Sequence, residues 1–401
     1  MGSKDNVTME LVEAAVDGNL ARVKNLLAKG ARADFQMPRK YSKIPKLAGL
    51  SALMAAAANG AGECVEALAA VSDVDQDFNG KTALMMAVEA NNSEACRCVE
   101  ILLAAGADAT RRRPDGLTCL LAATLDPSPQ GLAKILALAA ASDPAATPIA
   151  KDSPDCGLTA LMIAVKRRDE PRVEALAKMG AIGQESTRHG WTALSFASQL
   201  ESLPIVDVLL CHGAQDAPDH RGRTALIWAA KRGSAQIARR LLPTANIDAQ
   251  DEDGISALAE AARGGFPLAV QALVEAGANR GAKSKSGATA LMEAARGGHV
   301  ACAKILLSAG VDAVDGAWRG PLFYAVEGRS LEMVELLLPL LDPRWKDAEG
   351  RTAAEAARQS SPPQIEMAER IEARALALAE KDLLSRALGA AASRQSGSGR
   401  I

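Results

Sequence analysis

The sequence predicts an all-α protein, a solenoid of about ten to eleven short helix–turn–helix units. A Thr- or Ser-led apolar stretch recurs along the chain, and from Thr159 onward its copies start 31 to 33 residues apart. A glycine-containing break then divides most units into two short helical segments. Apolar residues make up 48% of the chain and aromatic residues only 3%. This composition suits close-packed short helices better than one large globular core.

Residues 287–310 show the pattern of one unit most clearly. The hydroxyl of Thr289 can accept a hydrogen bond from the first helical turn, so we expect a helix from there to about Ala295. Gly297-Gly298 ends this helix, and a second helix is expected from about Val300 to Gly310. Each helix carries one apolar stripe. Two helices this short cannot bury both stripes alone, so the unit needs a similar neighbour on each side.

Equivalent unit starts are spread over the whole chain. Besides Thr289 they are Ser51, Thr82, Thr118, Thr159, Thr192, Thr224, Ser256 and Thr352, with Gly320 in the same slot. A Leu-Leu-x-x-Gly-Ala-Asp string closes the unit at residues 102–108 and has relatives elsewhere. On these motifs the chain resembles the ankyrin-repeat family, whose period is about 33 residues. The Thr-Ala-Leu-Met variant also resembles, more weakly, the ankyrin-rich protein 21.1 group of protozoa. The family resemblance implies finger loops between the units and binding of other proteins.

The order of segments along the chain follows from local composition. Prolines placed close together cannot continue a helix and mark loops, whereas an Ala- and Glu-rich stretch near the end suits a capping helix, and a Ser/Gly-rich tail suits disorder. We therefore expect a disordered N-terminus at 1–7, a solenoid at 8–375 with loop insertions near 35–48, 126–130 and 142–156, a C-terminal capping helix at 376–392 and a disordered tail at 393–401.

The units depart from the family's Thr-Pro-Leu-His start. Ala replaces the Pro in most units, and no unit has the His that links neighbouring family repeats. Apolar residues such as Met54, Met162 and Met292 take its place, which exchanges a polar bond for flexible apolar packing. We expect looser units, weakest at the irregular fourth unit that begins at Thr118. In the last unit Glu355 stands where an inner apolar residue is expected.

Charge and cysteine content limit the environment. The formal net charge of −2 gives no bulk attraction to nucleic acid or to an anionic membrane. No apolar run approaches the roughly 18 residues of a membrane span, and no secretion signal is indicated. Of seven cysteines, Cys64, Cys98 and Cys302 take core positions, as expected in a reducing compartment. We expect a monomeric cytoplasmic protein, with the nucleus as the alternative, that is neither secreted nor transmembrane.

The sequence offers no case for catalysis. Its four histidines show no metal-ligand or triad spacing, and phosphate-binding glycine motifs do not appear. Cys211, His212 and His220 lie close together but lack a paired C-x-x-C partner, so surface residues are favoured over a zinc site. We therefore predict a protein that is not an enzyme and has no cofactor, no metal and no catalytic residues.

The resemblance implies that the two residues after each first helix's Ala-Ala, together with the finger tips, line a concave partner-binding face. A row of basic residues occupies these positions in the later units: Lys166, Arg167, Lys231, Arg232, Arg263 and Arg296. The functional interpretation is a groove for an acidic or phosphorylated peptide or helix. The alternative, which the sequence favours slightly, is that these residues only keep the surface solvated. Phe78, Trp318 and Arg221 are the candidate finger anchors.

Three functions remain open at this stage. The leading one is a non-enzymatic scaffold or adaptor that binds another protein on the concave face and fingers. A regulatory or targeting subunit of an enzyme carried on another chain would have the same sequence features. Nucleic-acid binding through the basic row is less favoured, because the net charge is close to zero and few aromatic residues are present for base stacking.

Overall fold

The computed structural model describes residues 3–37, 48–139, 158–183, 189–307 and 319–397. The chain forms two compact units, Met1–Gln215 and Asp216–Ile401. Within each unit, odd-numbered first helices pack on first helices of the neighbouring pairs, and even-numbered second helices pack on second helices. The predicted all-α fold of repeated helix pairs is thus confirmed, with a number of pairs that is compatible with the expected repeat count.

The first unit contains six helix pairs and one two-stranded ribbon among its described residues. Their bounds are α1 (Ser3–Val16), α2 (Leu20–Ala28), α3 (Ala52–Asn59), α4 (Gly62–Ala69), β1 (Asp77–Phe78), β2 (Lys81–Thr82), α5 (Ala83–Glu89), α6 (Ala95–Ala104), α7 (Cys119–Leu125), α8 (Pro129–Leu138), α9 (Ala160–Lys166), α10 (Glu170–Lys178), α11 (Ala193–Gln199) and α12 (Leu203–Cys211).

The second unit contains five helix pairs among its described residues. Their bounds are α13 (Ala225–Arg232), α14 (Ala235–Leu241), α15 (Ala257–Arg263), α16 (Pro267–Glu275), α17 (Ala290–Gly297), α18 (Val300–Leu307), α19 (Pro321–Glu327), α20 (Leu331–Leu337), α21 (Ala353–Gln359) and α22 (Ile365–Gly397).

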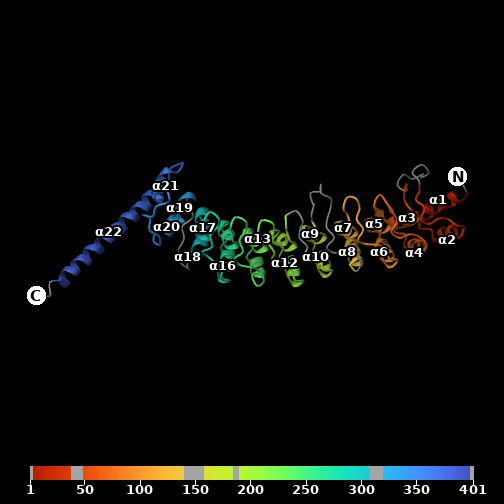
Figure 1. The fold of residues 1–401 in the computed structure, drawn as a ribbon, viewed down its shortest axis with the longest axis horizontal. Coiled ribbons are helices and arrows are strands. Elements are labelled where there is room, and N and C mark those ends of the chain that lie inside the picture. Colours follow the sequence, from red (N-terminus) through yellow and green to blue (C-terminus); the bar gives the residue numbers. More distant parts are fainter. Residues whose placement is uncertain (1–2, 38–47, 140–157, 184–188, 308–318, 398–401) are drawn as a thin grey trace. The chain divides into compact units, whose positions relative to one another are not determined.

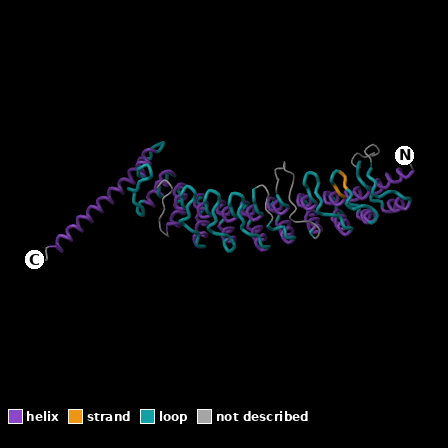
Figure 2. Tube along the Cα trace, in the orientation of Figure 1, coloured by secondary structure: helices purple, strands orange, loops and turns teal. Residues whose placement is uncertain are grey.

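Where the structure describes them, the finger loops between pairs end at the N-cap of a first helix. The strands β1 and β2 form an antiparallel ribbon in one finger (Figure 2). Single bridges such as Gln250 with Ser256, and Lys346 with Thr352, close other fingers in the same way. The residue at the end of the finger is therefore extended, which is the conformation that a helix N-cap residue adopts.

Hydroxyl side chains start nearly all of the first helices. In seven of them the N-cap oxygen accepts the backbone N–H three residues later: Ser51, Thr82, Thr118, Thr159, Thr192, Thr224 and Ser256. Thr352 does the same, and the Glu355 carboxylate accepts the Thr352 N–H at 2.7 Å in return. Glu355 is thus an exposed member of a capping box rather than an inner residue.

The core of each unit is built from small residues on the first helices. Ala229, Ala261, Ala294 and Ala325 each have 0% exposure, and they repeat at the contacts between neighbouring first helices. A methyl side chain lets two helix backbones approach closely, so each first helix is buried almost all round. This explains why the chain needs so few aromatic residues.

The irregular fourth pair, α7 and α8, is held by two buried cations. Lys134 is 0% exposed, and its Nζ donates to the Ala90 carbonyl at 2.8 Å and lies 2.9 Å from the Asp126 carboxylate. Arg172 donates to the carbonyls of Asp126 and Ser128 at 2.9 and 2.6 Å. The predicted loop near 126–130 is therefore short and fixed from both sides, and α8 begins at Pro129.

The ends of the chain differ from the expected segments. Helix α1 begins at Ser3, inside the stretch 1–7 that the sequence predicted to be disordered. Helix α22 runs without a break from Ile365 to Gly397, across both the expected start of the cap at 376 and the expected tail at 393. Most of the 35–48 insertion, all of 142–156 and the last four residues lie outside the described residues. Within the described ranges, no helix combines the length and the apolarity that crossing a bilayer requires.

Asp216 is a half-buried residue whose carboxylate lies beside the start of α13. It accepts the backbone N–H groups of Ala225 and Leu226, yet burial outweighs these bonds and raises its pKa to about 6. Because the folded-state value lies above the ordinary 3.8, the ionised form destabilises the fold above pH 6. This penalty of about 3 kcal/mol falls as the pH decreases through 6 and has vanished below about 3.8.

We expect Asp216→Asn to raise the free energy of unfolding at pH 7.5 by about 1 kcal/mol, because the amide removes the buried charge but serves one N–H group less well. The advantage should shrink as the pH falls from 7 to 4. Urea denaturation of both proteins across this range measures it. A variant that is less stable than the wild type at pH 7.5 would show that the carboxylate's hydrogen bonds dominate.

Candidate partner-binding face

The predicted basic row lies at the C-terminal ends of first helices. In the second unit Lys231 and Arg232 end α13, Arg263 ends α15, and Arg296 lies in the last turn of α17. These first helices are seven or eight residues long and pack on one another in order, and the basic side chains hold equivalent positions at their ends. We call this surface the first-helix face.

Two arginines of the row are tied to acidic side chains. Arg263 places its Nε 3.1 Å and its Nη2 3.2 Å from the two carboxylate oxygens of Glu293 in the next pair. Its Nη1 lies 3.7 Å from Glu260, one helical turn earlier. These bonds, above all the one to Glu293, raise the pKa of the Arg263 guanidinium. Because the Glu293 side chain is only 5% exposed, it depends on arginine for its partner.

The same arrangement continues toward the C-terminus. The Nη1 of Arg296 lies 3.7 Å from Glu293 and its Nε 3.4 Å from Glu327, which also pairs with Arg319. Both guanidinium groups stand over the ring of Tyr324, with centroid distances of 4.5 and 5.4 Å. Opposite charges therefore alternate from pair to pair. We call this set the charge ladder: Glu260, Arg263, Glu293, Arg296, Glu327 and Arg319.

The charge ladder changes how the predicted basic row can bind a partner. An acidic partner would have to compete with Glu293 and Glu327 for Arg263 and Arg296. The sequence analysis missed Glu260 and Glu293 because it compared only the positions after Ala-Ala. The signal was present, since Glu precedes Arg by three residues in both Leu-Ala-Glu-Ala-Ala-Arg and Leu-Met-Glu-Ala-Ala-Arg, a spacing that pairs side chains on a helix.

Lys231 and Arg232 differ from the ladder arginines. Both are exposed, and within the described residues neither lies within ion-pair distance of a carboxylate. The Lys231 ammonium stands 5.4 Å from the ring centroid of Trp228, which is 6% exposed and also carries the Arg223 guanidinium at 4.6 Å. These two residues are the part of the predicted row that presents positive charge to solvent in the second unit.

In the first unit the predicted pair Lys166 and Arg167 ends α9. Lys166 is exposed, whereas Arg167 donates through Nη1 to the carbonyls of Thr124 and Leu125 at 3.1 and 2.9 Å. Arg167 thus satisfies the free carbonyl groups at the end of α7. Its charge is not cancelled by a carboxylate there, because the groups that accept its hydrogen bonds are neutral carbonyls.

Of the predicted finger anchors, Phe78 belongs to the first unit and Arg221 to the second. Phe78 is half-buried in β1, where its ring covers Gly49 so closely that a side chain at that position would clash with it. The Arg221 side chain is 66% exposed and pairs with Glu252 of the next finger at 3.6 Å. Trp318 lies outside the described residues. Phe78 thus packs within its own unit, and Arg221 remains available at a finger tip.

The buried cysteines have raised pKa values. Burial raises the pKa of Cys119 to about 12 and those of Cys98 and Cys302 to about 11, so these thiols stay protonated. Among the described residues, no three His, Cys, Asp or Glu side chains are grouped closely enough to hold a metal ion.

Comparison with known families agrees with the repeat pattern. Four overlapping or adjacent segments match the family model for ankyrin repeats in sets of three copies: residues 11–113, 120–218, 215–284 and 258–347. Together these segments cover well over half of the sequence. No match was found among curated proteins.

We expect Glu293→Gln to lower the free energy of unfolding by about 1–2 kcal/mol, because it leaves two arginines without their shared carboxylate. The half-exposed arginines keep this cost below that of a fully buried pair. Urea denaturation monitored by circular dichroism measures the change. Glu369→Gln, at an exposed position of α22, is the matched control and should change stability by less than about 0.5 kcal/mol. Equal effects of the two substitutions would rule out a stabilising ladder.

Proposed function

Because the chain belongs to the ankyrin-repeat family, we propose that it is a non-enzymatic scaffold or adaptor that binds another protein through its first-helix face and finger loops. Ankyrin repeats generally mediate protein–protein interactions. The repeats account for most of the sequence, so we take protein binding to be the main activity of the chain. We propose that the first-helix face takes the role of the face through which members of the family bind their partners.

The observation that carries the proposal is the positive surface at the end of α13. Lys231 and Arg232 are exposed beside Trp228, on a helix whose apolar residues are buried and whose N-terminus is capped by Thr224. A rigid backbone presents both charges, so little conformational freedom is lost when a partner binds. We propose that acidic groups of the partner contact these residues first, with Lys166, Arg167 and Arg221 as further contacts within their own units.

The charge ladder supports a partner surface of mixed charge. Arg263 and Arg296 can contact acidic groups of the partner, while Glu327, which is 39% exposed, can contact a basic one. Such alternation favours partners with a complementary pattern over any acidic chain, because a mismatched charge would face a like charge. We therefore propose a specific protein partner rather than a general polyanion.

The test is affinity enrichment from a matched cell lysate, comparing the wild type with the double variant Lys231→Glu and Arg232→Glu. We expect a discrete set of proteins to be lost, because four units of charge change at the proposed contact. The matched control is Arg239→Glu with Lys304→Glu, which makes the same charge change at exposed positions of the second helices α14 and α18. Circular dichroism checks that all three proteins fold equally. If both double variants recover the same proteins as the wild type, the basic row is only a solvated surface.

A further inference from the structure

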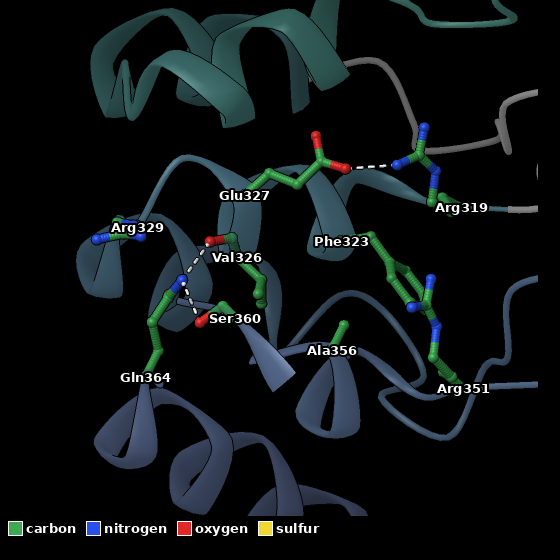
Figure 3. A pocket seen from close by; sticks show the side chains of 9 residues that line it. All are labelled: Arg319, Phe323, Val326, Glu327, Arg329, Arg351, Ala356, Ser360 and Gln364. Carbon is green, nitrogen blue, oxygen red and sulfur yellow. Dashed lines mark hydrogen bonds and ion pairs between the residues drawn. The ribbon is translucent and has the colours of Figure 1, made fainter. Parts of the chain in front are cut away.

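A small pocket lies beside the last helix pair of the second unit, at a position where the earlier pairs carry a large side chain. The residue four positions after the N-cap is large in the earlier pairs of the second unit, as Trp228, Glu260, Glu293 and Tyr324. In the last pair the same position is Ala356. Beside it lies a pocket of about 150 Å³, shown in Figure 3. The missing side chain volume at Ala356 thus leaves a hollow between α19 and α21.

Apolar side chains line the inner part of this pocket. Phe323 and Val326 come from α19 and are 5% and 3% exposed, and Ala356 faces them from α21. Ser360 and Gln364 close one side, where the Gln364 amide donates to the Val326 carbonyl at 3.0 Å and to the Ser360 hydroxyl at 3.2 Å. These bonds fix the wall of the pocket in one conformation.

The rim of the pocket is cationic. Arg319, Arg329 and Arg351 line it together with one carboxylate, that of Glu327. The partners of Arg351 are Asp347 and Glu349, at 2.9 and 2.8 Å, and neither of them lines the pocket. Arg329 donates to the neutral carbonyl of Ser361, and no carboxylate among the described residues lies within ion-pair distance of it. Among the guanidinium groups that line the pocket, Arg329 is therefore the one without a carboxylate partner in the described residues.

We propose that this pocket receives an anionic side chain of the protein partner, a carboxylate or a phosphoryl group. The inference rests on the proposed function, since Arg329 offers an acidic group of the partner a contact for which no carboxylate of the described residues competes. The apolar floor suits the methylene stem of such a side chain, and the guanidinium groups suit its charged end. The pocket is well below the roughly 300–1,000 Å³ of small-molecule sites, so it holds the end of one side chain.

The test measures binding of fluorescein-labelled hexaglutamate and of a Gly/Ser peptide with one phosphoserine to the full chain, by fluorescence anisotropy at low salt. Hexaglutamine of the same length is the uncharged control. The key variant is Ala356→Leu, which fills the pocket without changing any charge. We expect it to weaken binding about tenfold, as for the loss of one charge-assisted hydrogen bond. Ala377→Leu, on an exposed face of α22, should bind as the wild type does.

A second variant keeps the test informative if Ala356→Leu disturbs folding. Arg329→Gln removes the unpaired charge but retains a donor for the Ser361 carbonyl, and we expect a loss of roughly threefold to tenfold. The peptide that loses more affinity identifies the natural group as carboxylate or phosphoryl. If neither substitution changes the binding of either peptide, the proposal that the pocket receives an anionic side chain is wrong. If lysate proteins are nevertheless lost with the Lys231 and Arg232 variant, the proposed function stands without this pocket.

Discussion

The structure depends on one constraint, that no helix pair can bury its own apolar surface. First helices of seven or eight residues, such as α13 and α15, are too short to be stable alone. Contact with the neighbouring pairs supplies their stability, and alanine at the closest positions lets the backbones approach. Ala229 and Ala261 are fully buried for this reason. Polar residues consequently gather at the helix ends, in the fingers and at the rim of the face, and buried exceptions such as Lys134 and Glu293 have ionic partners.

The fold could be predicted from the sequence because this constraint repeats. Each Thr or Ser at a unit start fixes a helix N-terminus through a local bond that needs no tertiary information. Departures from the period were harder to interpret. Lys134 is a charged residue in an apolar stretch, and only the three-dimensional course of the Asp126–Ser128 loop shows that Ala90 and Asp126 satisfy its ammonium group. Glu355 was likewise misread, because its role depends on side-chain direction at the cap.

The candidate site was predicted in position but not in electrostatics. A row of basic residues is found by comparing one position across the aligned units. Ion pairs are harder to find, because each of them joins residues of two neighbouring units. Arg263 reaches Glu293 across 30 residues, which equals one repeat less one helical turn. Arg296 and Glu327 instead hold the same position in consecutive pairs, each seven residues after its N-cap, so their separation of 31 residues equals one full repeat. In a periodic sequence such ladders can therefore be found by examining opposite charges separated by one period, or by one period less one helical turn.

The ladder also explains where binding specificity can reside in this chain. Neighbouring family repeats are linked by a histidine that this protein lacks, and the ladder provides a polar link between consecutive first helices instead. Side chains engaged in that link cannot be optimised freely for a partner, because each substitution also changes the contact between pairs. Residues at the two ends of the ladder escape this coupling. Lys231 and Arg232 precede it, and Arg329 and Ala356 of the pocket lie outside its ion pairs, so selection on a partner can act at these residues at the least cost to the fold.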